Sequence, residues 1–420
     1  MKYVIIGNGV AAIGAIEGIR KVDQDHPVTV VSAEHYKTYG RPLISQLLSG
    51  KIRQRDMYYR PESYYDENKI KLLLEKSVVK INPGRKNILL EDGAKIPFDR
   101  LLIATGGIPF VPEIKGGKGP DIYSFTTLDD AGRLDSLVGR VKEMVVLGGG
   151  LIGLKVAESL RDRGVRVTIV ELADRILSAA FDGAAGGIIA RRLSEVGIEI
   201  ILNDSIREIV RKKGRVTGVI LTSGQKRRCE GVVIAIGVVP NKTIIEGTRI
   251  KANRGILTDG HMETSIPGIY AAGDVTEPVD MVLGERRVTP IWPNAYLQGY
   301  YAGLNMAGAE RIYSGGFSMN SIEFYGIPTV SMGLANPPGD GYEVIYRLAP
   351  EKNIYRKIVL RDGILVGAVL VGRIDRAGIL TGFIRSRIRV HDFKEELLRE
   401  DFGFVHVPAA VRKQVLSANP

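Results

Sequence analysis

One short pattern occurs twice in this chain, and each copy joins an apolar stretch to a glycine turn and a run of small residues. The first copy is YVIIGNGVAAIG at 3–14, and the second is EMVVLGGGLIGLKVA at 143–157. Glycines in such a turn let backbone N–H groups and a helix N-terminus approach a pyrophosphate that side chains would block. The repeat therefore predicts two dinucleotide-binding units, each built as strand, turn and helix. The turn positions are Gly7, Gly9 and Ala12 in the first copy and Gly148, Gly150, Leu151, Ile152 and Gly153 in the second.

Each copy is followed, about twenty residues on, by a second apolar strand that ends in an acid. VTVVSAE closes at Glu34, and VTIVE closes at Glu171. A carboxylate at this place accepts hydrogen bonds from a ribose 2′-hydroxyl and repels a 2′-phosphate. Further on, LLIATGGIPF at 101–110 is echoed by VVIAIGVVPN at 232–241. Because the matches follow in the same order, ordinary βα turns without a nucleotide explain the pair poorly.

Length and composition favour a soluble α/β protein. The 420 residues allow two or three domains with separate cores. Strong apolar runs alternate with helical stretches, which is typical of parallel sheets covered on both faces. No apolar run approaches the roughly 18 residues that a membrane helix needs, and the glycines behind Lys2 suit the nucleotide turn better than a secretory signal. We therefore expect a cytoplasmic protein without a membrane partner.

The cysteine and histidine content limits the redox chemistry. Cys229 is the only cysteine, so the chain can form no internal disulfide and ligate no iron–sulfur cluster through its own thiolates. The histidines show no metal-ligand spacing, so no metal site is predicted. Redox metals, if involved, must belong to a partner. The net charge of +11 could steer an acidic iron–sulfur protein or nucleic acid, or the basic surface could be solvated without a dedicated role.

The order of the segments predicts one dinucleotide-binding domain inserted within another. GGKGP at 116–120 reads as a flexible hinge between them. The strand-like segment 254–275 ends in Gly273-Asp274, and an insertion is the simplest way to place it beside the first glycine turn. From about Ser321, short alternating strands precede helices, which predicts a third, α+β domain. The expected domains are 1–115 with 245–320, 116–244, and 321–420.

With the two glycine turns, Ala104-Thr105-Gly106 and IYAAGDV in this order, the chain resembles the FAD- and NAD(P)H-dependent pyridine nucleotide-disulfide oxidoreductase superfamily over essentially its whole length. The resemblance implies a glutathione-reductase-like architecture of two Rossmann-like domains. In that family the first unit binds FAD and the inserted unit binds NAD(P)H, and Glu171 favours NADH over NADPH. The residues implied at FAD are Gly7, Gly9 and Ala12 at the pyrophosphate, Glu34 at the ribose, Asp274 at the ribitol, and Ala104, Thr105, Gly106 and Gly273. Those implied at NAD(H) are Gly148, Gly150, Leu151, Ile152, Gly153, Glu171 and Gly237.

Two further segments are similar to rubredoxin-, ferredoxin- and nitrite-reductase-type members. The segment that begins RPLIS resembles their RPxLS sequence beside the flavin, which implies that Arg41, Pro42 and Ser45 lie there. WPNAYLQGYYAGLNMAG at 292–308 resembles their late helix and implies that Trp292 lies near the isoalloxazine. Taken alone, Trp292 would more simply be a core residue.

The chain departs from the family at the redox cysteine. Disulfide-using members carry a reactive cysteine beside the flavin, in the region that corresponds to 43–48, and this chain has none there. Cys229 lies on the strand leading to VVIAIG, where it fits a small core hydrophobe. Disulfide, CoA-disulfide and cysteine-sulfenate chemistry are therefore disfavoured, and electrons must leave the flavin directly.

A second departure concerns charge near the reacting atoms. Lys155 stands where many members have the glutamate of GGGxIGxE, and Gln46 stands where some ferredoxin reductases have a lysine. Our hypothesis is that Lys155 supplies, from the opposite side, the positive charge that favours reduced flavin. The alternative is a helix lysine whose stem lies along apolar surface while its amine reaches water.

Within the superfamily, MKYVIIGNGVAAIGAIEGI and GGGLIGLKVAESL look most similar to the NADH-linked FAD subunits of multi-subunit 2-oxoacid dehydrogenases, particularly phenylglyoxylate dehydrogenase. That resemblance implies a subunit of a hetero-oligomeric complex whose iron–sulfur partner delivers electrons for NAD reduction. A free-standing rubredoxin or ferredoxin reductase, or an NADH oxidase, remains open. So does a nicotinamide-sensing flavoprotein similar to apoptosis-inducing factor, although nucleic-acid binding is not favoured. The basic stretch that could serve it, dock an acidic subunit or be merely solvated comprises Arg373, Arg376, Arg385, Arg387 and Arg389.

Overall fold

The computed structural model describes residues 1–417, which divide into two compact units. The first unit comprises Met1–Leu43, Arg53–Ile108 and Val238–Phe317. The second comprises Ile44–Ile52, Pro109–Gly237 and the described residues from Ser318 onward. No helix in residues 1–417 is both long and apolar enough to cross a lipid bilayer.

The first unit is built on a parallel sheet with strand order β18-β7-β1-β2-β3. Every residue of the central strand β1 is buried, which explains why these strands read as continuous apolar runs. Strand β18 pairs with β7 although most of the second unit lies between them in sequence, so the chain does return to its first sheet. The strands are β1 (Tyr3–Ile6), β2 (Val28–Val31), β3 (Ile70–Leu73), β7 (Arg100–Ile103) and β18 (Ile269–Ala271), with an antiparallel sheet of β4 (Val78–Asn82), β5 (Asn87–Leu90) and β6 (Lys95–Pro97), and the pair β8 (Gly107–Pro109) and β17 (Val238–Pro240).

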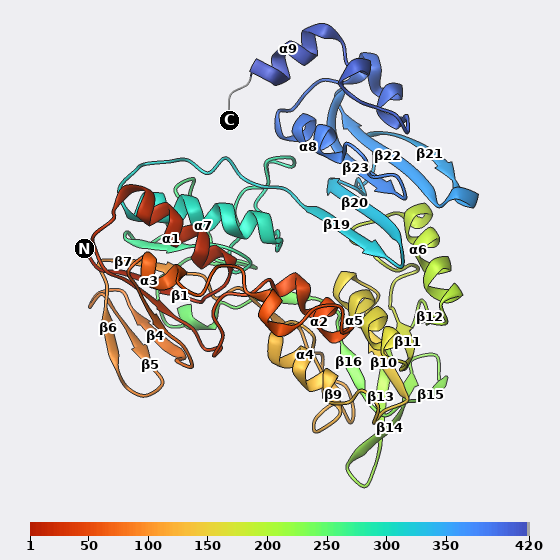
Figure 1. Cartoon of the computed structure of the whole chain (residues 1–420), viewed down its shortest axis with the longest axis horizontal. Coiled ribbons are helices and arrows are strands. Elements are labelled where there is room, and N and C mark those ends of the chain that lie inside the picture. Colours follow the sequence, from red (N-terminus) through yellow and green to blue (C-terminus); the bar gives the residue numbers. More distant parts are fainter. Residues whose placement is uncertain (418–420) are drawn as a thin grey trace. The chain divides into compact units, whose positions relative to one another are not determined.

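Helices α1 (Val10–Val22) and α7 (Trp292–Met306) lie side by side in the first unit (Figure 1). Glycines spaced four apart on each helix make this close approach possible. A Cβ atom on Gly14 would lie 2.2 Å from the carbonyl oxygen of Tyr296, and one on Gly299 would lie 2.0 Å from a carbonyl oxygen of α1. Gly18 and Gly303 continue the two glycine faces. Only residues without a side chain let the two backbones approach this closely. The short helix α3 (Tyr64–Glu67) also belongs to this unit.

The second unit repeats the parallel arrangement with strand order β12-β11-β10-β16-β9. The turn after β10 leads into α5, as the turn after β1 leads into α1. Its strands are β9 (Ile122–Tyr123), β10 (Glu143–Leu147), β11 (Arg166–Val170), β12 (Glu199–Ile201) and β16 (Val232–Ile234), with an antiparallel sheet of β13 (Ile206–Lys212), β14 (Arg215–Leu221) and β15 (Lys226–Arg228). Its helices are α2 (Ile44–Leu48), α4 (Leu128–Asp135), α5 (Leu151–Asp162) and α6 (Gly183–Glu195).

The second unit also contains the C-terminal sheet, which is antiparallel with strand order β19-β20-β23-β22-β21. Strands β22 and β23 are buried along almost their whole length. Both α6 and α8 contact β23, and the 3-10 helix His391–Leu398 contacts β22. The elements are β19 (Met319–Phe324), β20 (Ile327–Gly333), β21 (Glu343–Ala349), β22 (Ile354–Arg361), β23 (Ile364–Val371), α8 (Ala377–Arg385) and α9 (Ala409–Ser417). The predicted fold class is thus confirmed. The three predicted domain ranges stay a prediction.

Candidate functional site

The first glycine turn joins β1 to α1 and lies against the end of β7. Gly7 has a φ of +104°, and a Cβ atom there would lie 2.1 Å from the carbonyl oxygen of Ala104, so only glycine fits. Gly9 precedes the helix, and no described atom lies within 4 Å of the place its Cβ would take. The first N–H groups of α1 lack helical partners and carry its positive dipole end. These residues fit a dinucleotide pyrophosphate, with the fully buried Ala12 behind them.

The side chain of Asn8 fastens this turn to two later segments of the first unit. The hydroxyl of Tyr65 donates to Asn8 Oδ1 at 2.8 Å, and the hydroxyl of Thr38 lies 3.0 Å from the same oxygen and 2.8 Å from the Asn8 backbone carbonyl oxygen. Neither Tyr65 nor Thr38 was among the site residues predicted from the sequence. The only sequence feature that pointed to them was an asparagine, Asn8, inside a glycine turn, and this feature alone does not identify partners that lie far away in the sequence.

Glu34, the acid predicted to bind the FAD ribose, already accepts hydrogen bonds from two side chains. Glu34 follows β2, and its carboxylate accepts a hydrogen bond from the Tyr39 hydroxyl at 2.7 Å. Arg41 donates to the other carboxylate oxygen at 2.6 Å. The structure therefore brings Glu34 together with Arg41, the first residue of the RPLIS segment. Thr105 lies beyond β7, where its hydroxyl donates to the carbonyl oxygen of Asn241 at 2.7 Å.

Asp274 lies in the turn after β18. Gln298 of α7 shapes the turn by accepting from the Gly273 N–H and the Thr276 hydroxyl, both at 2.8 Å. Burial raises the pKa of Asp274 to about 6, and the charge of Arg41 opposes this shift. Among residues 1–417 the Asp274 carboxylate makes no hydrogen bond or ion pair. A desolvated acceptor of this kind suits a ligand hydroxyl, because buried polar groups are normally paired.

Trp292 is the first residue of α7 and the only tryptophan in the sequence. Its half-buried ring meets the ring of Tyr59 edge to face, with centroids 5.3 Å apart. The Arg60 guanidinium lies 4.3 Å from the Tyr59 ring centroid and pairs with Glu17 of α1 at 2.8 Å. Tyr59 and Arg60 were not among the predicted site residues, although they lie in a tyrosine-rich stretch, residues 58–65, that runs into α3.

The second glycine turn reproduces the first. Gly148 has a φ of +111°, and its Cβ would lie 2.4 Å from the carbonyl oxygen of Ala235. No described atom lies within 4 Å of the Cβ position of Gly150, which precedes α5 and its first residues Leu151 and Ile152. A Cβ on Gly153 would lie 1.9 Å from the Gly148 carbonyl oxygen. This turn also fits a pyrophosphate.

The acid after β11 faces the second glycine turn directly. Glu171 accepts hydrogen bonds from the N–H groups of Gly149 at 2.5 Å and Ala173 at 2.7 Å. The carbonyl oxygen of Gly149 in turn accepts from the N–H of Leu177 at 2.8 Å. Gly237 lies beyond β16 with a φ of +122° and open space at its Cβ position among the described atoms.

Lys155, on the second turn of α5, is held by groups of its own unit. Its amine lies 2.5 Å from the carboxylate of Glu158 and donates to the Glu323 carbonyl at 3.2 Å. Burial raises the pKa of Glu158, and Lys155 opposes the shift. These contacts hold the amine of Lys155 against protein groups of the second unit. Its role beside flavin and the alternative of an amine that reaches water both stay predictions. Ser45 also lies in the second unit, where its carbonyl accepts from the Ser159 hydroxyl at 2.8 Å.

Comparison with known families settles the classification. The model of the pyridine nucleotide-disulphide oxidoreductases matches residues 1–299, and that of the rubredoxin NAD+ reductase C-terminal domain matches residues 319–388. The chain belongs to the pyridine nucleotide-disulphide oxidoreductase family. As a member it is an NAD(P)H-dependent flavin oxidoreductase, and FAD and NAD(H) are the cofactors typical of the family.

Three relatives illustrate the range of this oxidoreductase family. The epsilon subunit of the NADH-dependent phenylglyoxylate dehydrogenase of Aromatoleum evansii is 29% identical over 99% of this chain and 97% of its own length. A ferredoxin reductase of the CYP199A2 system from Rhodopseudomonas palustris is 25% identical with a TM-score of 0.87, over 97% of this chain and all of that one. The NADH:rubredoxin oxidoreductase of Clostridium acetobutylicum is 27% identical with a TM-score of 0.77, over 92% of this chain and 96% of that one.

Cys229 sets this family member apart from disulfide-using relatives. Its side chain is fully buried in the core of the second unit, and burial raises the pKa of its thiol to about 12. Since the thiolate is the reactive form, a thiol with this pKa is inert near neutral pH. The predicted core role of Cys229 agrees with its burial.

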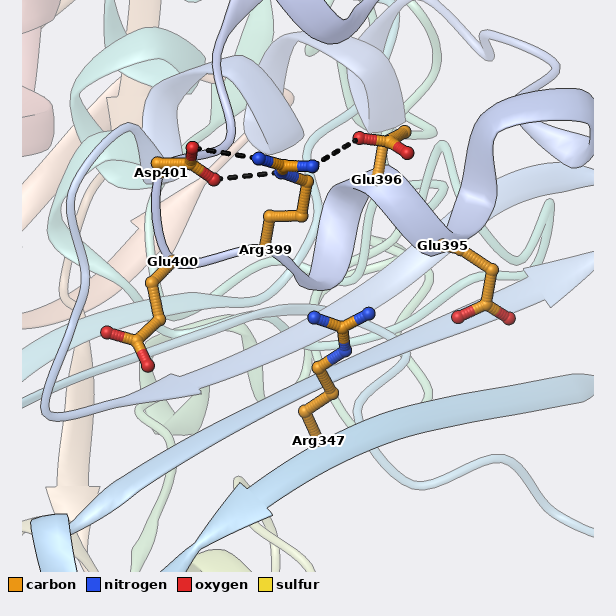
Figure 2. Close-up of a pocket in the computed structure, with 6 residues that line it drawn as sticks. All are labelled: Arg347, Glu395, Glu396, Arg399, Glu400 and Asp401. Carbon is orange, nitrogen blue, oxygen red and sulfur yellow. Dashed lines mark hydrogen bonds and ion pairs between the residues drawn. The ribbon is translucent and has the colours of Figure 1, made fainter.

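A hollow of about 310 Å³ lies in the C-terminal part of this oxidoreductase (Figure 2). Within it Arg399 bonds to Asp401 at 2.8 Å and lies 3.5 Å from Glu396. None of the predicted cofactor residues lines it. The lining residues are Arg347, Glu395, Glu396, Arg399, Glu400 and Asp401.

Proposed function

We propose that this pyridine nucleotide-disulphide oxidoreductase exchanges hydride with NAD(H) through FAD and exchanges single electrons with an iron–sulfur partner. The burial of Cys229 carries the proposal, because the sole thiol of the chain cannot act as a disulfide relay. Full-length similarity to a phenylglyoxylate dehydrogenase subunit supports a finer assignment. In that assignment the protein is the NAD-reducing subunit of a multi-subunit 2-oxoacid dehydrogenase.

In this proposal 1–115 and 245–320 form the FAD-binding domain. When bound, FAD supplies the conversion between two-electron and one-electron transfer. The turn at Gly7 and Gly9 would bind the pyrophosphate through backbone N–H groups. Glu34 would accept from the adenosine ribose while Arg41 holds it in place. The Asp274 carboxylate, unpaired in residues 1–417, would accept from a ribitol hydroxyl.

The domain 116–244 would bind NAD(H) by the same device, and 321–420 would form an interface domain. Gly148 and Gly150 would admit the pyrophosphate to the N-terminus of α5. Glu171 would accept from the ribose 2′-hydroxyl. Its carboxylate already points at the glycine turn, where it would repel the 2′-phosphate of NADPH.

The test is an anaerobic NADH titration of the purified chain, followed by visible absorbance before and after an oxidised iron–sulfur acceptor is added. Bleaching of the flavin band near one NADH per FAD, with reoxidation by the acceptor, is the expected result. A chain without bound flavin, or with flavin that NADH cannot reduce, would overturn the proposal and leave a binding or assembly role.

A second candidate is a stand-alone NADH:rubredoxin or ferredoxin reductase. The match of residues 319–388 to the rubredoxin reductase C-terminal domain favours it. Rapid turnover with free rubredoxin or ferredoxin, and no copurifying subunits, would support this candidate. Vigorous turnover with oxygen alone would instead indicate an NADH oxidase, as in the relative of that name, which is 31% identical.

A nicotinamide-sensing flavoprotein is the remaining alternative. Binding to DNA or to an acidic partner requires accessible basic side chains, and Arg385, Arg387 and Arg389 are exposed. A steeply salt-dependent affinity for DNA would support it. Salt-dependent electron transfer to a ferredoxin would support docking of an acidic iron–sulfur partner instead.

A further inference from the structure

The loop that follows β11 lies directly over the second glycine turn. This loop, residues 172–182, approaches Gly149 so closely that a Cβ there would lie 3.0 Å from Ile176. The N–H of Leu177 donates to the Gly149 carbonyl at 2.8 Å. Leu177 is buried and has a φ of +56°, a conformation that a leucine adopts only when its surroundings impose it. The 172–182 loop therefore fixes the peptide groups of Gly149 but depends on outside contacts for its own shape.

The C-terminal sheet supplies the first of these contacts through Asn336, which follows β20. The side-chain amide of Asn336 donates to the carbonyl oxygens of Ser178 at 3.0 Å and Phe181 at 3.2 Å. Both acceptors belong to the 172–182 loop. Removal of the amide would leave two backbone acceptors without these donors, and such losses are costly in part-buried places.

The second contact holds the end of the loop. Asp182 accepts from the amine of Lys357 and the hydroxyl of Tyr355, both on β22 and both at 2.7 Å. It also caps α6 by accepting from the N–H of Ala185 at 3.1 Å. Burial alone would raise the pKa of Asp182, but the bonds from Lys357 and Tyr355 lower it below its usual range.

Lys357 is an unusual residue for its position. It is only 5% exposed and lies in the middle of β22, next to the fully buried Ile358. A buried ammonium costs free energy unless it is paired, and an apolar residue of similar volume often serves stability as well. The ion pair of Lys357 with Asp182, at the end of the 172–182 loop, better explains a lysine at this position.

We infer that the C-terminal sheet positions the NAD-binding glycine turn, with Asn336 and Lys357 acting as positioning residues through the 172–182 loop. The inference rests on the proposed NAD site and is independent of the electron partner. Asn336 and Lys357 bond to residues of the loop. The loop in turn fixes the position of Gly149 through the Leu177 N–H, and the Gly149 N–H donates to the carboxylate of Glu171. A shift of the loop would move both the pyrophosphate donors and the acid assigned to the ribose. Its first effect would be on NADH affinity.

The test uses the full-length protein with Asn336→Leu and Lys357→Met, which remove the donors but keep most of the side-chain volume. Arg191→Ala is the matched control. Arg191 also joins α6 to the C-terminal sheet, because it donates to the Pro350 carbonyl at 2.7 Å and to Asn353 at 2.8 Å, but both acceptors lie outside the loop. Each variant is characterised by its melting temperature, by NADH fluorescence titration of flavin-free protein, and by stopped-flow flavin reduction at varied NADH.

Asn336→Leu and Lys357→Met are expected to raise the Kd for NADH about tenfold, the cost of one or two hydrogen bonds, with an unchanged limiting rate of flavin reduction. Arg191→Ala should keep the wild-type Kd even if its melting temperature falls. Wild-type affinity in both loop variants, or an equal rise in the control, would overturn the inference. If Lys357→Met does not fold, Tyr355→Phe removes a single donor and should give a smaller rise. Wild-type protein that binds no NADH would refute the proposed NAD site and the inference with it.

Discussion

Replacing Asp274 by asparagine should stabilise the flavin-free protein at alkaline pH and, at the same time, weaken its affinity for FAD. Burial raises the pKa of this carboxyl from 3.8 to about 6. A raised pKa means that the folded protein prefers the protonated form. The stability contribution of Asp274 is therefore complete below pH 4 and is lost as the pH rises through 6.

The size of the effect follows from the shift. About two pKa units correspond to about 3 kcal/mol at pH 8, where the carboxylate is ionised in both the folded and the unfolded chain. At pH 5 the same linkage gives about half of that value. Asparagine has nearly the same shape and no charge. Asp274→Asn should thus gain about 3 kcal/mol at pH 8 and about 1.5 kcal/mol at pH 5.

Urea unfolding of the flavin-free protein measures this gain, and the fluorescence of Trp292 reports it, because Trp292 is the sole tryptophan and lies in the same unit. Asp66→Asn, an exposed acid of the same unit, is the control and should change stability little at either pH. FAD titration should show an affinity about tenfold lower for Asp274→Asn, because the charged acceptor is lost. Equal stability of wild type and variant at pH 8 would refute the reasoning, as would unchanged FAD affinity.

The remaining predictions concern three other positions. Lys155→Met should slow single-turnover flavin reduction about tenfold if the charge of Lys155 acts near flavin. Glu158→Gln keeps that charge and should leave the rate unchanged. Equal rates for wild type and Lys155→Met would reject the hypothesis. Glu171→Ala should raise the ratio of kcat/KM for NADPH over NADH about tenfold, since the repulsion of the 2′-phosphate is lost, and an unchanged ratio would count against the assigned role. Gly299→Ala should destabilise the first unit by about 3 kcal/mol, because its Cβ would lie 2.0 Å from a carbonyl oxygen of α1. Gly132→Ala, in a helix position with open space among the described atoms, should be neutral or slightly stabilising, and equal melting temperatures of these two variants would contradict the close helix approach.

Local geometry explains why the two glycine turns could be predicted from sequence. Gly7 and Gly148 both adopt a positive φ that other residues avoid, so the spacing itself carries the information. The return of β18 to the first sheet was also predicted, because an inserted domain is the simplest way to place the strand-like segment that ends in Gly273-Asp274 beside the first glycine turn.

Contacts between distant segments could not be predicted from one sequence. No spacing rule joins Asn8 to Tyr65, or Asp182 to Lys357, since each pair depends on how separate elements pack. The ion pair of Lys155 with Glu158 was readable as neighbours on one helix face, but its bond to the Glu323 carbonyl was not.

The pairing of α1 with α7 has a consequence for how the protein is made. The glycine face of α1 leaves the ribosome long before α7, the helix that covers it, which ends only at Met306. All strands of the second parallel sheet are synthesised after α1 and before α7, and that sheet is complete once β16 has left the ribosome. Because domains fold as units during synthesis, the inserted sheet can fold while the first one still waits for β18 and α7. The glycine face of α1 therefore stays uncovered until α7 has been made, and its apolar surface is exposed to other chains during that time.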